Sequence, residues 1–255
     1  MIHPVDPKKW ESPTILSVED LSVSFDGFKA VDISSFYIDK NEVLVVIGPN
    51  GAGKTTLLDL ISGKTKRSTG KIKFGEHDIS GMAEQKIVKM GIGRKFQTPS
   101  IYPDLTVFEN LEVSHPRGRS VFGALFFKRD QEIMDQVHDI ADTIMLKDML
   151  DEKASLLSHG QKQWLEIGML LIADHKLIML DEPVAGMSVR ERELTANLLA
   201  EICKGRSVMV VEHDMNFVRQ IAHRVTVLHQ GKVLAEGPMS EIENDQRVID
   251  VYIGH

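Results

Sequence analysis

The chain has 255 residues, of which 42% are hydrophobic and 26% are charged, as in ordinary soluble globular proteins. This length allows one large domain, or a core domain with a smaller satellite. The net charge of −7 argues against a general nucleic-acid binder, which carries a basic face. The one cysteine, Cys203, excludes internal disulfides and lies in a helical apolar pattern, so we interpret it as a small buried side chain.

The sequence predicts no membrane-spanning helix, because it lacks an apolar stretch of about 20 residues. Residues 1–14 lack the apolar segment of a secretion signal and are interpreted as an N-terminal tail. Any role at a membrane is therefore expected to work through partner proteins.

The first predicted elements are strands that lead into a glycine-rich turn. Leu16–Phe25 partly alternates between apolar and polar residues, as an antiparallel strand does. A second strand is expected over Ile33–Ile38, and the apolar run Val43–Ile47 predicts a third. A helix is expected to follow the turn and to end near Gly63.

The turn itself reads Gly48-Pro49-Asn50-Gly51-Ala52-Gly53-Lys54-Thr55, followed by Thr56, which is the pattern of a phosphate-binding P-loop. Its glycines let backbone N–H groups converge on an anion, and the helix N-terminus adds partial positive charge. Lys54 is expected to neutralise the β- and γ-phosphates, and the Thr55 hydroxyl is expected to hold Mg²⁺. A chance glycine-rich turn is the alternative, and it leaves the flanking strand and helix unexplained.

The middle of the chain, residues 98–173, is predicted to be largely helical. Thr106 is expected to begin a helix, because Glu109 stands three residues later at the spacing of a capping box. Another helix is predicted over Gln131–Met145. The apolar segment Val121–Phe127 is interpreted as core of this region, with a surface for a partner as the alternative.

Strands and helices alternate on both sides of this helical part, as they do in an α/β nucleotide-binding core. Before it, we expect strands over Gly70–Gly75 and Gly91–Phe96 and a helix over Met82–Met90. After it, we expect strands over Leu177–Asp181, Ser207–Val211, Arg224–Leu228 and Lys232–Ala235, and helices over Met215–Ala222 and over Ser188–Lys204, closed by Gly205.

Two acidic residues end the apolar strand Leu177–Asp181. Such a strand is buried on both faces of a parallel sheet, and ligands bind at the carboxyl ends of these strands. Asp181 is therefore expected to position Mg²⁺, directly or through water, and Glu182 to act as general base on a water aimed at the γ-phosphate. The alternative, a solvated loop, does not fit a pair that follows a buried strand downstream of a P-loop.

The stretch Leu157-Ser158-His159-Gly160-Gln161 combines a helix cap with a glycine. Ser158 and Gln161 have the spacing of a capping box, which predicts a helix through Trp164. A helix N-terminus with a glycine and a free hydroxyl can also hold an anion. Both interpretations remain open from these residues alone.

The three motifs, in this order, resemble those of ATP-binding cassette (ABC) ATPases from about Leu16 to the C-terminus. The resemblance implies an α/β fold with a P-loop NTPase core, in which a mixed sheet has helices on both faces. It also implies an antiparallel β subdomain and an inserted α-helical subdomain. Residues 15–255 would form one ATPase domain, with 15–97 and 174–255 as the nucleotide-binding core and 98–173 as the helical subdomain.

The resemblance also implies roles for single residues. Gln97 matches a glutamine that touches Mg²⁺ or the attacking water, and His213 matches a histidine that contacts the γ-phosphate. Phe25 matches an aromatic residue that stacks on adenine, with a core position as the alternative, and Val31 is expected to pack on the base. The signature residues, expected to act on ATP held by a partner subunit, are Ser158, His159, Gly160 and Gln161.

Two positions depart from the family pattern. His159 replaces the first glycine of Leu-Ser-Gly-Gly-Gln, and Ser188 stands where the loop after the acidic pair commonly ends in Asp. The histidine either points outward, which preserves binding, or weakens this half-site. We expect it to point outward, because residues 157–171 resemble the ATPases of urea importers, within the branched-chain amino-acid transporter branch. This resemblance extends through Asp181–Met187, Val211–Met215, Val227–Gly231 and Val248–Gly254.

The resemblance implies an ATP-hydrolysing subunit of an importer for urea, a branched-chain amino acid or an amide. In this family the signature of one subunit closes on ATP held by another, so dimerisation with itself or a homologous cassette is expected. ATP and Mg²⁺ are the expected cofactors. Transmembrane permease subunits are the expected partners at the cytoplasmic face of the inner membrane, with a periplasmic substrate-binding protein acting indirectly and no nucleic acid.

Rival interpretations use the same motifs. The same ATPase could serve an exporter or a soluble assembly complex. DNA-repair and chromosome ATPases are disfavoured, because only about 100 residues, without heptads, separate Lys54 from Ser158. A catalytically silent regulatory subunit is disfavoured by Glu182 and His213, although His159 and Ser188 leave it open.

Overall fold

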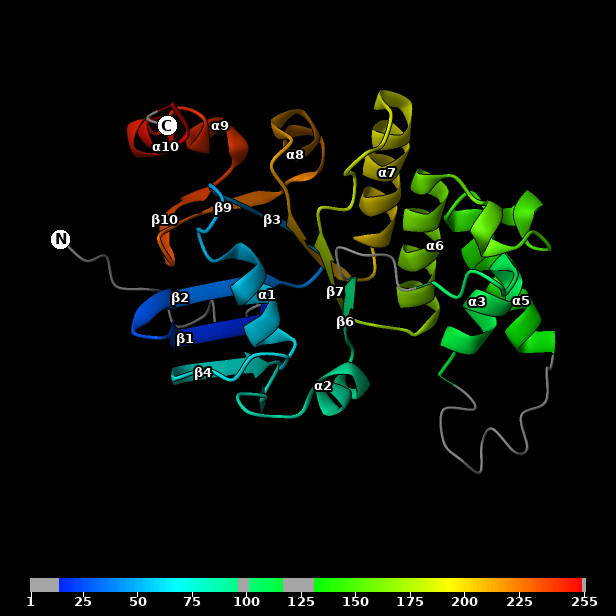
Figure 1. Ribbon diagram of the computed structural model, residues 1–255, viewed down its shortest axis with the longest axis horizontal. Helices are drawn as coiled ribbons and strands as arrows, with labels where there is room; N and C mark the ends of the chain where they lie inside the picture. Colours follow the sequence, from blue (N-terminus) through cyan, green and yellow to red (C-terminus); the bar gives the residue numbers. More distant parts are fainter. Residues whose placement is uncertain (1–13, 96–100, 117–130, 254–255) are drawn as a thin grey trace.

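The computed structural model describes residues 14–95, 101–116 and 131–253. Within these ranges the strands form two sheets, and helices pack against them (Figure 1). The predicted tail up to residue 13 and the apolar segment Val121–Phe127 lie outside the described residues.

The larger sheet is mixed, as predicted. Its strands are β3 (Val43–Ile47), β6 (Ile92–Lys95), β7 (Leu177–Asp181), β8 (Ser207–Val211), β9 (Arg224–His229) and β10 (Lys232–Gly237). In the described residues their order is β10-β9-β3-β8-β7-β6. All neighbours pair in parallel except β10, which runs antiparallel to β9 at one edge.

The central strands β3, β7 and β8 are buried at every residue. Their side chains alternate between two cores. In β3, Val43, Val45 and Ile47 belong to the core under the helices, whereas Leu44 and Val46 belong to the core shared with the smaller sheet. A continuously apolar strand fits this position, because both of its faces are covered.

The smaller sheet is antiparallel and has the order β2-β1-β4-β5 in the described residues. It consists of β1 (Thr14–Phe25), β2 (Phe28–Asp39), β4 (Thr69–Phe74) and β5 (His77–Asp78). β1 and β2 form a hairpin through Asp26 and Gly27, whose φ values of 48° and 85° are those that a tight hairpin turn requires. At its other end β1 begins at Thr14, two residues before the predicted start at Leu16.

The helical part lies beyond β6 and β7 (Figure 1). It contains α3 (Val107–Ser114), α5 (Gln131–Thr143) and α6 (His159–Ile172), which pack on one another. The predicted capping box at Thr106 is confirmed, because the Glu109 N–H donates to Thr106 Oγ1 over 3.1 Å and the Thr106 N–H donates to Glu109 Oε2 over 2.8 Å.

The remaining helices flank the larger sheet or follow it. They are α1 (Lys54–Ile61), α2 (Glu84–Met90), α7 (Val189–Ile202), α8 (Met215–Ile221), α9 (Met239–Ile242) and α10 (Gln246–Ile253). The predicted closure of α7 by Gly205 is wrong: α7 ends at Ile202 and is capped by Cys203 in a right-handed conformation. None of the helices among the described residues is long and apolar enough to cross a membrane.

Cys203 is buried, as predicted, and its thiol donates to the Asn41 carbonyl over 2.9 Å. Burial raises the pKa of the Cys203 thiol, with the Glu42 carboxylate adding to the shift. A protonated, enclosed thiol is a poor nucleophile. The residue is therefore a core side chain.

A buried ion pair joins the helical part to the sheet. Lys95 Nζ at the end of β6 lies 3.6 Å from Glu166 Oε2 in α6, and the two side chains are 0% and 5% exposed. Burial lowers the pKa of Lys95, and the Glu166 carboxylate opposes that shift. The pair links the helix that begins with the signature to the strand that ends just before Gln97.

We predict that Glu166→Gln destabilises the chain by about 3 kcal/mol or more, because it removes the counter-charge of a buried ammonium. Urea denaturation measures the difference. The control is Glu201→Gln, whose partner Lys204 is exposed and whose loss is expected to cost less than about 1 kcal/mol. Equal effects of the two substitutions would contradict a structural role for the buried pair.

Candidate active site

The glycine-rich turn between β3 and α1 ends in a backbone conformation that favours glycine. Gly53, which precedes α1, has a φ of 101°, and a Cβ there would lie 2.6 Å from the Ala30 carbonyl oxygen. The first turn of α1 carries no acidic residue. Its unpaired N–H groups and the helix dipole therefore favour an anion at this end.

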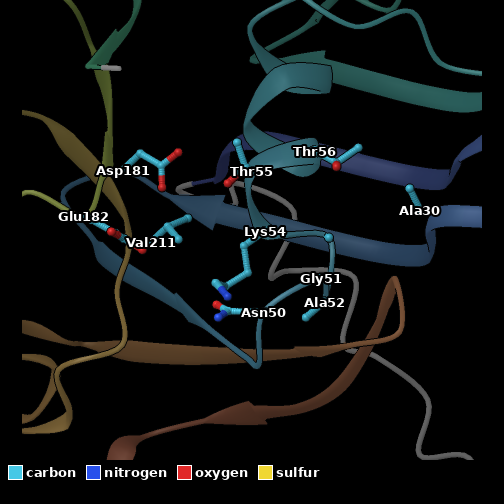
Figure 2. A pocket seen from close by; sticks show the side chains of 11 residues that line it. Ala30, Asn50, Gly51, Ala52, Lys54, Thr55, Thr56, Asp181, Glu182 and Val211 are labelled. Carbon is cyan, nitrogen blue, oxygen red and sulfur yellow. The ribbon is translucent and has the colours of Figure 1, made fainter. Parts of the chain in front are cut away.

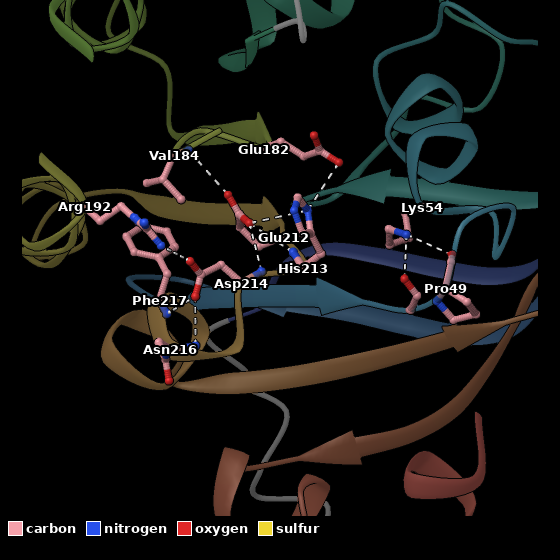
Figure 3. Close-up of polar contacts among 11 residues, drawn as sticks. Pro49, Lys54, Glu182, Val184, Arg192, Glu212, His213, Asp214, Asn216 and Phe217 are labelled. Atoms are coloured by element: carbon pink, nitrogen blue, oxygen red, sulfur yellow. Dashed lines mark hydrogen bonds and ion pairs between the residues drawn. The ribbon is translucent and has the colours of Figure 1, made fainter. Parts of the chain in front are cut away.

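Lys54, the first residue of α1, folds back over the turn (Figure 3). Its Nζ donates to the carbonyls of Gly48 over 2.7 Å and Pro49 over 3.0 Å. Burial lowers the pKa of Lys54, while the carboxylates of Glu182 and Asp181 oppose the shift. The ammonium is thus held beside the turn and faces two acidic groups.

A cavity of about 300 Å³ opens between this turn and the ends of β7 and β8. Figure 2 shows side chains from α1, the turn and the two strand ends around it. The predicted residues that line it are Asn50, Gly51, Ala52, Gly53, Lys54, Thr55, Thr56, Asp181 and Glu182. Ala30 and Val211, which the sequence did not single out, complete the lining.

Asp181 ends β7 and is 5% exposed. Burial raises the pKa of its carboxyl, the Arg94 guanidinium opposes the shift, and Glu182 adds to it. Arg94 Nη2 lies 3.8 Å from Asp181 Oδ2, and Arg94 also forms an ion pair with Asp59 of α1. Arg94 therefore ties β6 and β7 to the helix that follows the glycine-rich turn.

The residues of the cavity fit Mg²⁺ that arrives with a nucleotide. Thr55 and Asp181 offer a hydroxyl and a carboxylate, and Mg²⁺ takes oxygen ligands together with waters and substrate phosphates. In the part of the chain that the structure describes, no cluster of three His, Cys, Asp or Glu side chains could hold a metal by itself. Gln97, the third predicted ligand, lies outside the described residues.

Glu182 has a φ of 48°, a left-handed value that a residue with a side chain seldom adopts. Residues in such conformations cluster at active sites. Its Oε1 lies 3.6 Å from Nδ1 of His213, which follows β8 (Figure 3). The structure thus brings together the predicted general base and the predicted phosphate-contacting histidine, from neighbouring strands.

Glu212, at the end of β8, is 1% exposed and connects two loops. Its Oε2 accepts from the N–H groups of His213 over 3.0 Å and Asp214 over 3.3 Å, and its Oε1 accepts from the Val184 N–H over 3.4 Å (Figure 3). Burial raises the pKa of Glu212, and these backbone bonds oppose the shift. The carboxylate therefore fixes the loop after β7 relative to His213.

The predicted capping box at Ser158 is confirmed. The Gln161 N–H donates to Ser158 Oγ over 3.2 Å, and the Ser158 N–H donates to Gln161 Oε1 over 2.8 Å. None of the signature residues 158–161, all of which the structure describes, lines the cavity. The His159 ring lies instead against the carbonyl of Ala185, on the loop after β7.

Phe25 and Val31 differ in their surroundings. Phe25, at the end of β1, is 49% exposed, which excludes the alternative that it belongs to the core. Val31 is fully buried beside Gly53, and its neighbour Ala30 lines the cavity. Successive residues of a strand point to opposite faces, so the structure places Ala30, rather than Val31, at the cavity.

The sequence profile of the ABC transporter family matches residues 31–185. The chain belongs to this family. The high-affinity branched-chain amino acid transport ATP-binding protein LivG of Escherichia coli is 34% identical over 252 residues, which span 95% of this ABC cassette and 99% of LivG.

Solved structures of other ABC cassettes share the fold. The ADP conformation of MJ1267, an ATP-binding cassette of an ABC transporter, is 33% identical, with a TM-score of 0.84 over 95% of this chain and 99% of that one. MJ0796, an ATP-binding cassette described in a dimeric post-hydrolysis state bound to ADP and Pi, is similar in fold at 23% identity, with a TM-score of 0.72 over 88% of this chain and 98% of that one. The predicted fold class is confirmed, and the cassette is an ATPase, as its family membership requires.

We predict that Glu212→Gln lowers the free energy of unfolding by about 1–3 kcal/mol, because the amide has one acceptor oxygen for N–H groups that two oxygens now serve. The same substitution should shift the backbone ¹H–¹⁵N signals of Val184 and His213, whose N–H groups donate to Glu212. Urea denaturation and ¹⁵N correlation spectra measure the two effects. The control is Glu243→Gln, at an exposed ion pair with Arg219, which should leave both signals in place. Unmoved signals in Glu212→Gln would contradict the connection.

Proposed function

We propose that this cassette is the ATP-hydrolysing subunit of an importer, and that two cassettes close around ATP to drive uptake of a small polar solute. The observation that carries the proposal is the composition of the cavity. Lys54, Thr55 and Asp181 line it, whereas the signature at 158–161 does not. One chain therefore supplies the phosphate-binding half of a site and offers its signature to another chain. We assign residues 15–255 to one ATPase domain and 98–173 to its helical part.

In this proposal the turn at 48–56 holds the triphosphate of ATP. Its backbone N–H groups face the phosphate oxygens, and the Lys54 ammonium neutralises those of the β- and γ-phosphates. Mg²⁺ supplies charge neutralisation when bound, and we assign Thr55, Asp181 and Gln97 to hold it. The exposed ring of Phe25 is assigned to stack on adenine.

Hydrolysis requires an oriented water and little covalent help from the protein. We assign the Glu182 carboxylate to take a proton from that water while its oxygen attacks the γ-phosphorus and the bond to the β–γ bridging oxygen breaks. His213 is assigned to contact the γ-phosphate. The 3.6 Å between His213 Nδ1 and Glu182 Oε1 supports these roles, because it sets His213 beside a carboxylate that lines the cavity.

The second half of the site comes from a partner cassette, which is either a second copy of this chain or a homologous cassette. The N-terminus of α6 at Ser158 favours an anion, as the first turn of α1 does. Leu156, beside the signature, and Val189, at the start of α7, are 70% and 67% exposed, and a partner cassette that met this part of the chain would cover them. The dimeric state described for MJ0796 supports the same arrangement.

We place the cassette at the cytoplasmic face of the inner membrane, docked to permease subunits that form the path of the solute. A periplasmic binding protein delivers the solute and does not touch this chain. The description of LivG as a branched-chain amino acid transport protein supports a solute of that class. The resemblance of residues 157–171 to urea importers supports urea instead.

The experiment that identifies the solute measures the uptake of labelled urea and of labelled leucine into cells that lack this chain. The proposal expects uptake of one of the two to disappear and to return with the wild-type chain. Uptake of both solutes at the original rate would contradict an importer of this class.

We predict that Glu182→Gln lowers the rate of ATP hydrolysis by about 10²–10⁴, the range for loss of a general base. ATP affinity should be retained and the ATP-bound dimer stabilised, because the amide keeps the shape of the carboxylate. Phosphate release and size-exclusion chromatography with ATP measure the two effects, with exposed Glu201→Gln as the control. Undiminished turnover would refute the role of Glu182.

We predict that Lys54→Ala weakens ATP binding by tenfold or more, because it removes the cation that faces the phosphates at the turn. Isothermal titration calorimetry with ATP and Mg²⁺ measures the affinity. Lys86→Ala, at an exposed position of α2, should bind ATP like the wild-type chain. The assignment of Lys54 fails if its alanine variant binds ATP as tightly as the control.

A further inference from the structure

The two residues that depart from the family pattern lie at one contact between α6 and α7. α6 begins at His159, and Ser188 is the N-cap of α7 and ends the loop that follows β7. The two helices lie side by side (Figure 1), and Trp164 Nε1 donates to Thr195 Oγ1 between them over 2.9 Å. The contact joins the signature (residues 158–161) to the post-β7 loop (residues 182–188).

His159 makes the first link. Its Nε2 lies 3.0 Å from the carbonyl oxygen of Ala185, which can only accept, so the ring N–H donates. The ring also faces Gly186, where a Cβ would lie 3.4 Å from His159 Cδ2. The same Nε2 also lies 3.3 Å from Gln163 Nε2, and the contact with Ala185 is the shorter of the two.

Ser188 and Glu191 make the second link. The backbone N–H and the hydroxyl of Ser188 both donate to Glu191 Oε2, each over 2.8 Å. These bonds lower the pKa of Glu191, and the nearby His159 adds to the shift. An Asp at position 188 would cap α7 equally well, but its ionised side chain has no hydrogen to donate and would face the Glu191 carboxylate.

Glu191, held in this way, lies against the signature backbone. A Cβ on Gly160 would lie 2.4 Å from Glu191 Oε1, a separation that Cβ atoms essentially never have from a neighbouring side chain. A side chain at position 160 would therefore require the Glu191 side chain to move, whereas position 159 has room for a ring directed at Ala185.

We propose that His159 is a positioning residue that fixes the post-β7 loop against the signature, so that a second subunit meets the two segments as one surface. The inference rests on the proposed function, because it assumes that both segments face ATP bound by that subunit. Ala185 and Gly186 are exposed, as a segment that meets a partner must be. Because this loop begins at Glu182, the link also bears on where the predicted general base lies.

The link is tested in the isolated chain by hydrogen exchange at the amides of Ala185 and Met187, which donate to the carbonyls of Glu182 and Val184. The variants are His159→Gly, which has the family residue, and His159→Gln, which keeps an N–H donor. His77→Gly, at an exposed position of β5, is the matched control. We expect about fivefold faster exchange in His159→Gly, the effect of losing one hydrogen bond, and partial rescue in His159→Gln.

The role in catalysis is tested by the ATPase rate of the same variants in the assembled complex. His159→Gly should lower kcat severalfold, and the ATP affinity of the isolated chain should not change, because His159 does not line the cavity of its own chain. His159→Gln should recover most of kcat, and His77→Gly should match the wild-type chain.

Exchange in His159→Gly equal to that of the wild-type chain would overturn the link itself. Faster exchange with unchanged kcat would overturn its role in positioning, and so would a His159→Gln variant as slow as His159→Gly. If the wild-type complex hydrolyses no ATP, the proposed function fails, and the exchange experiment still decides whether His159 holds the loop.

Discussion

The site depends on the burial of three neighbouring parallel strands on both faces. Every residue of β3, β7 and β8 is buried, so polar side chains can reach solvent only after the strands end, at the carboxyl edge of the sheet. Lys54 follows β3 at that edge, Asp181 and Glu182 come from β7, and His213 follows β8. Hydrophobic burial of the strands thus places a cation and two carboxylates around one cavity, with the His213 imidazole 3.6 Å from one of the carboxylates.

Buried charges then hold these groups in place. Arg94 joins Asp181 to α1, Lys95 joins β6 to α6 through Glu166, and Glu212 fixes the backbone of two loops. Burial removes water from both charges, so an intact pair adds little net stability, although the loss of one partner leaves the other charge buried and unpaired. Their value lies in geometry: each connects an element of the site to one that carries a different part of it, and the loop that begins at Glu182 is held at both ends.

Local patterns were predictable, and contacts across the chain were not. The glycine-rich turn and the caps at Thr106 and Ser158 involve residues within a few positions of one another, so their spacing is enough to predict them. The expected contact of Val31 with the base stays a prediction; the residue of this strand that lines the cavity is Ala30, because neighbouring residues of a strand point to opposite faces. The bond between His159 and Ala185 joins residues 26 positions apart, and only the packing of α6 against α7 creates it.

The claim that ATP is cleaved between two chains is tested most directly by mixing two inactive variants. Lys54→Ala lacks the phosphate-binding half, and Ser158→Asp keeps the helix cap but sets a negative charge against the phosphates of a partner. Phosphate release should be absent from either variant alone and should appear in the mixture, because each mixed dimer has one complete site. Full turnover by Ser158→Asp alone would show that a single chain cleaves ATP without another chain's signature.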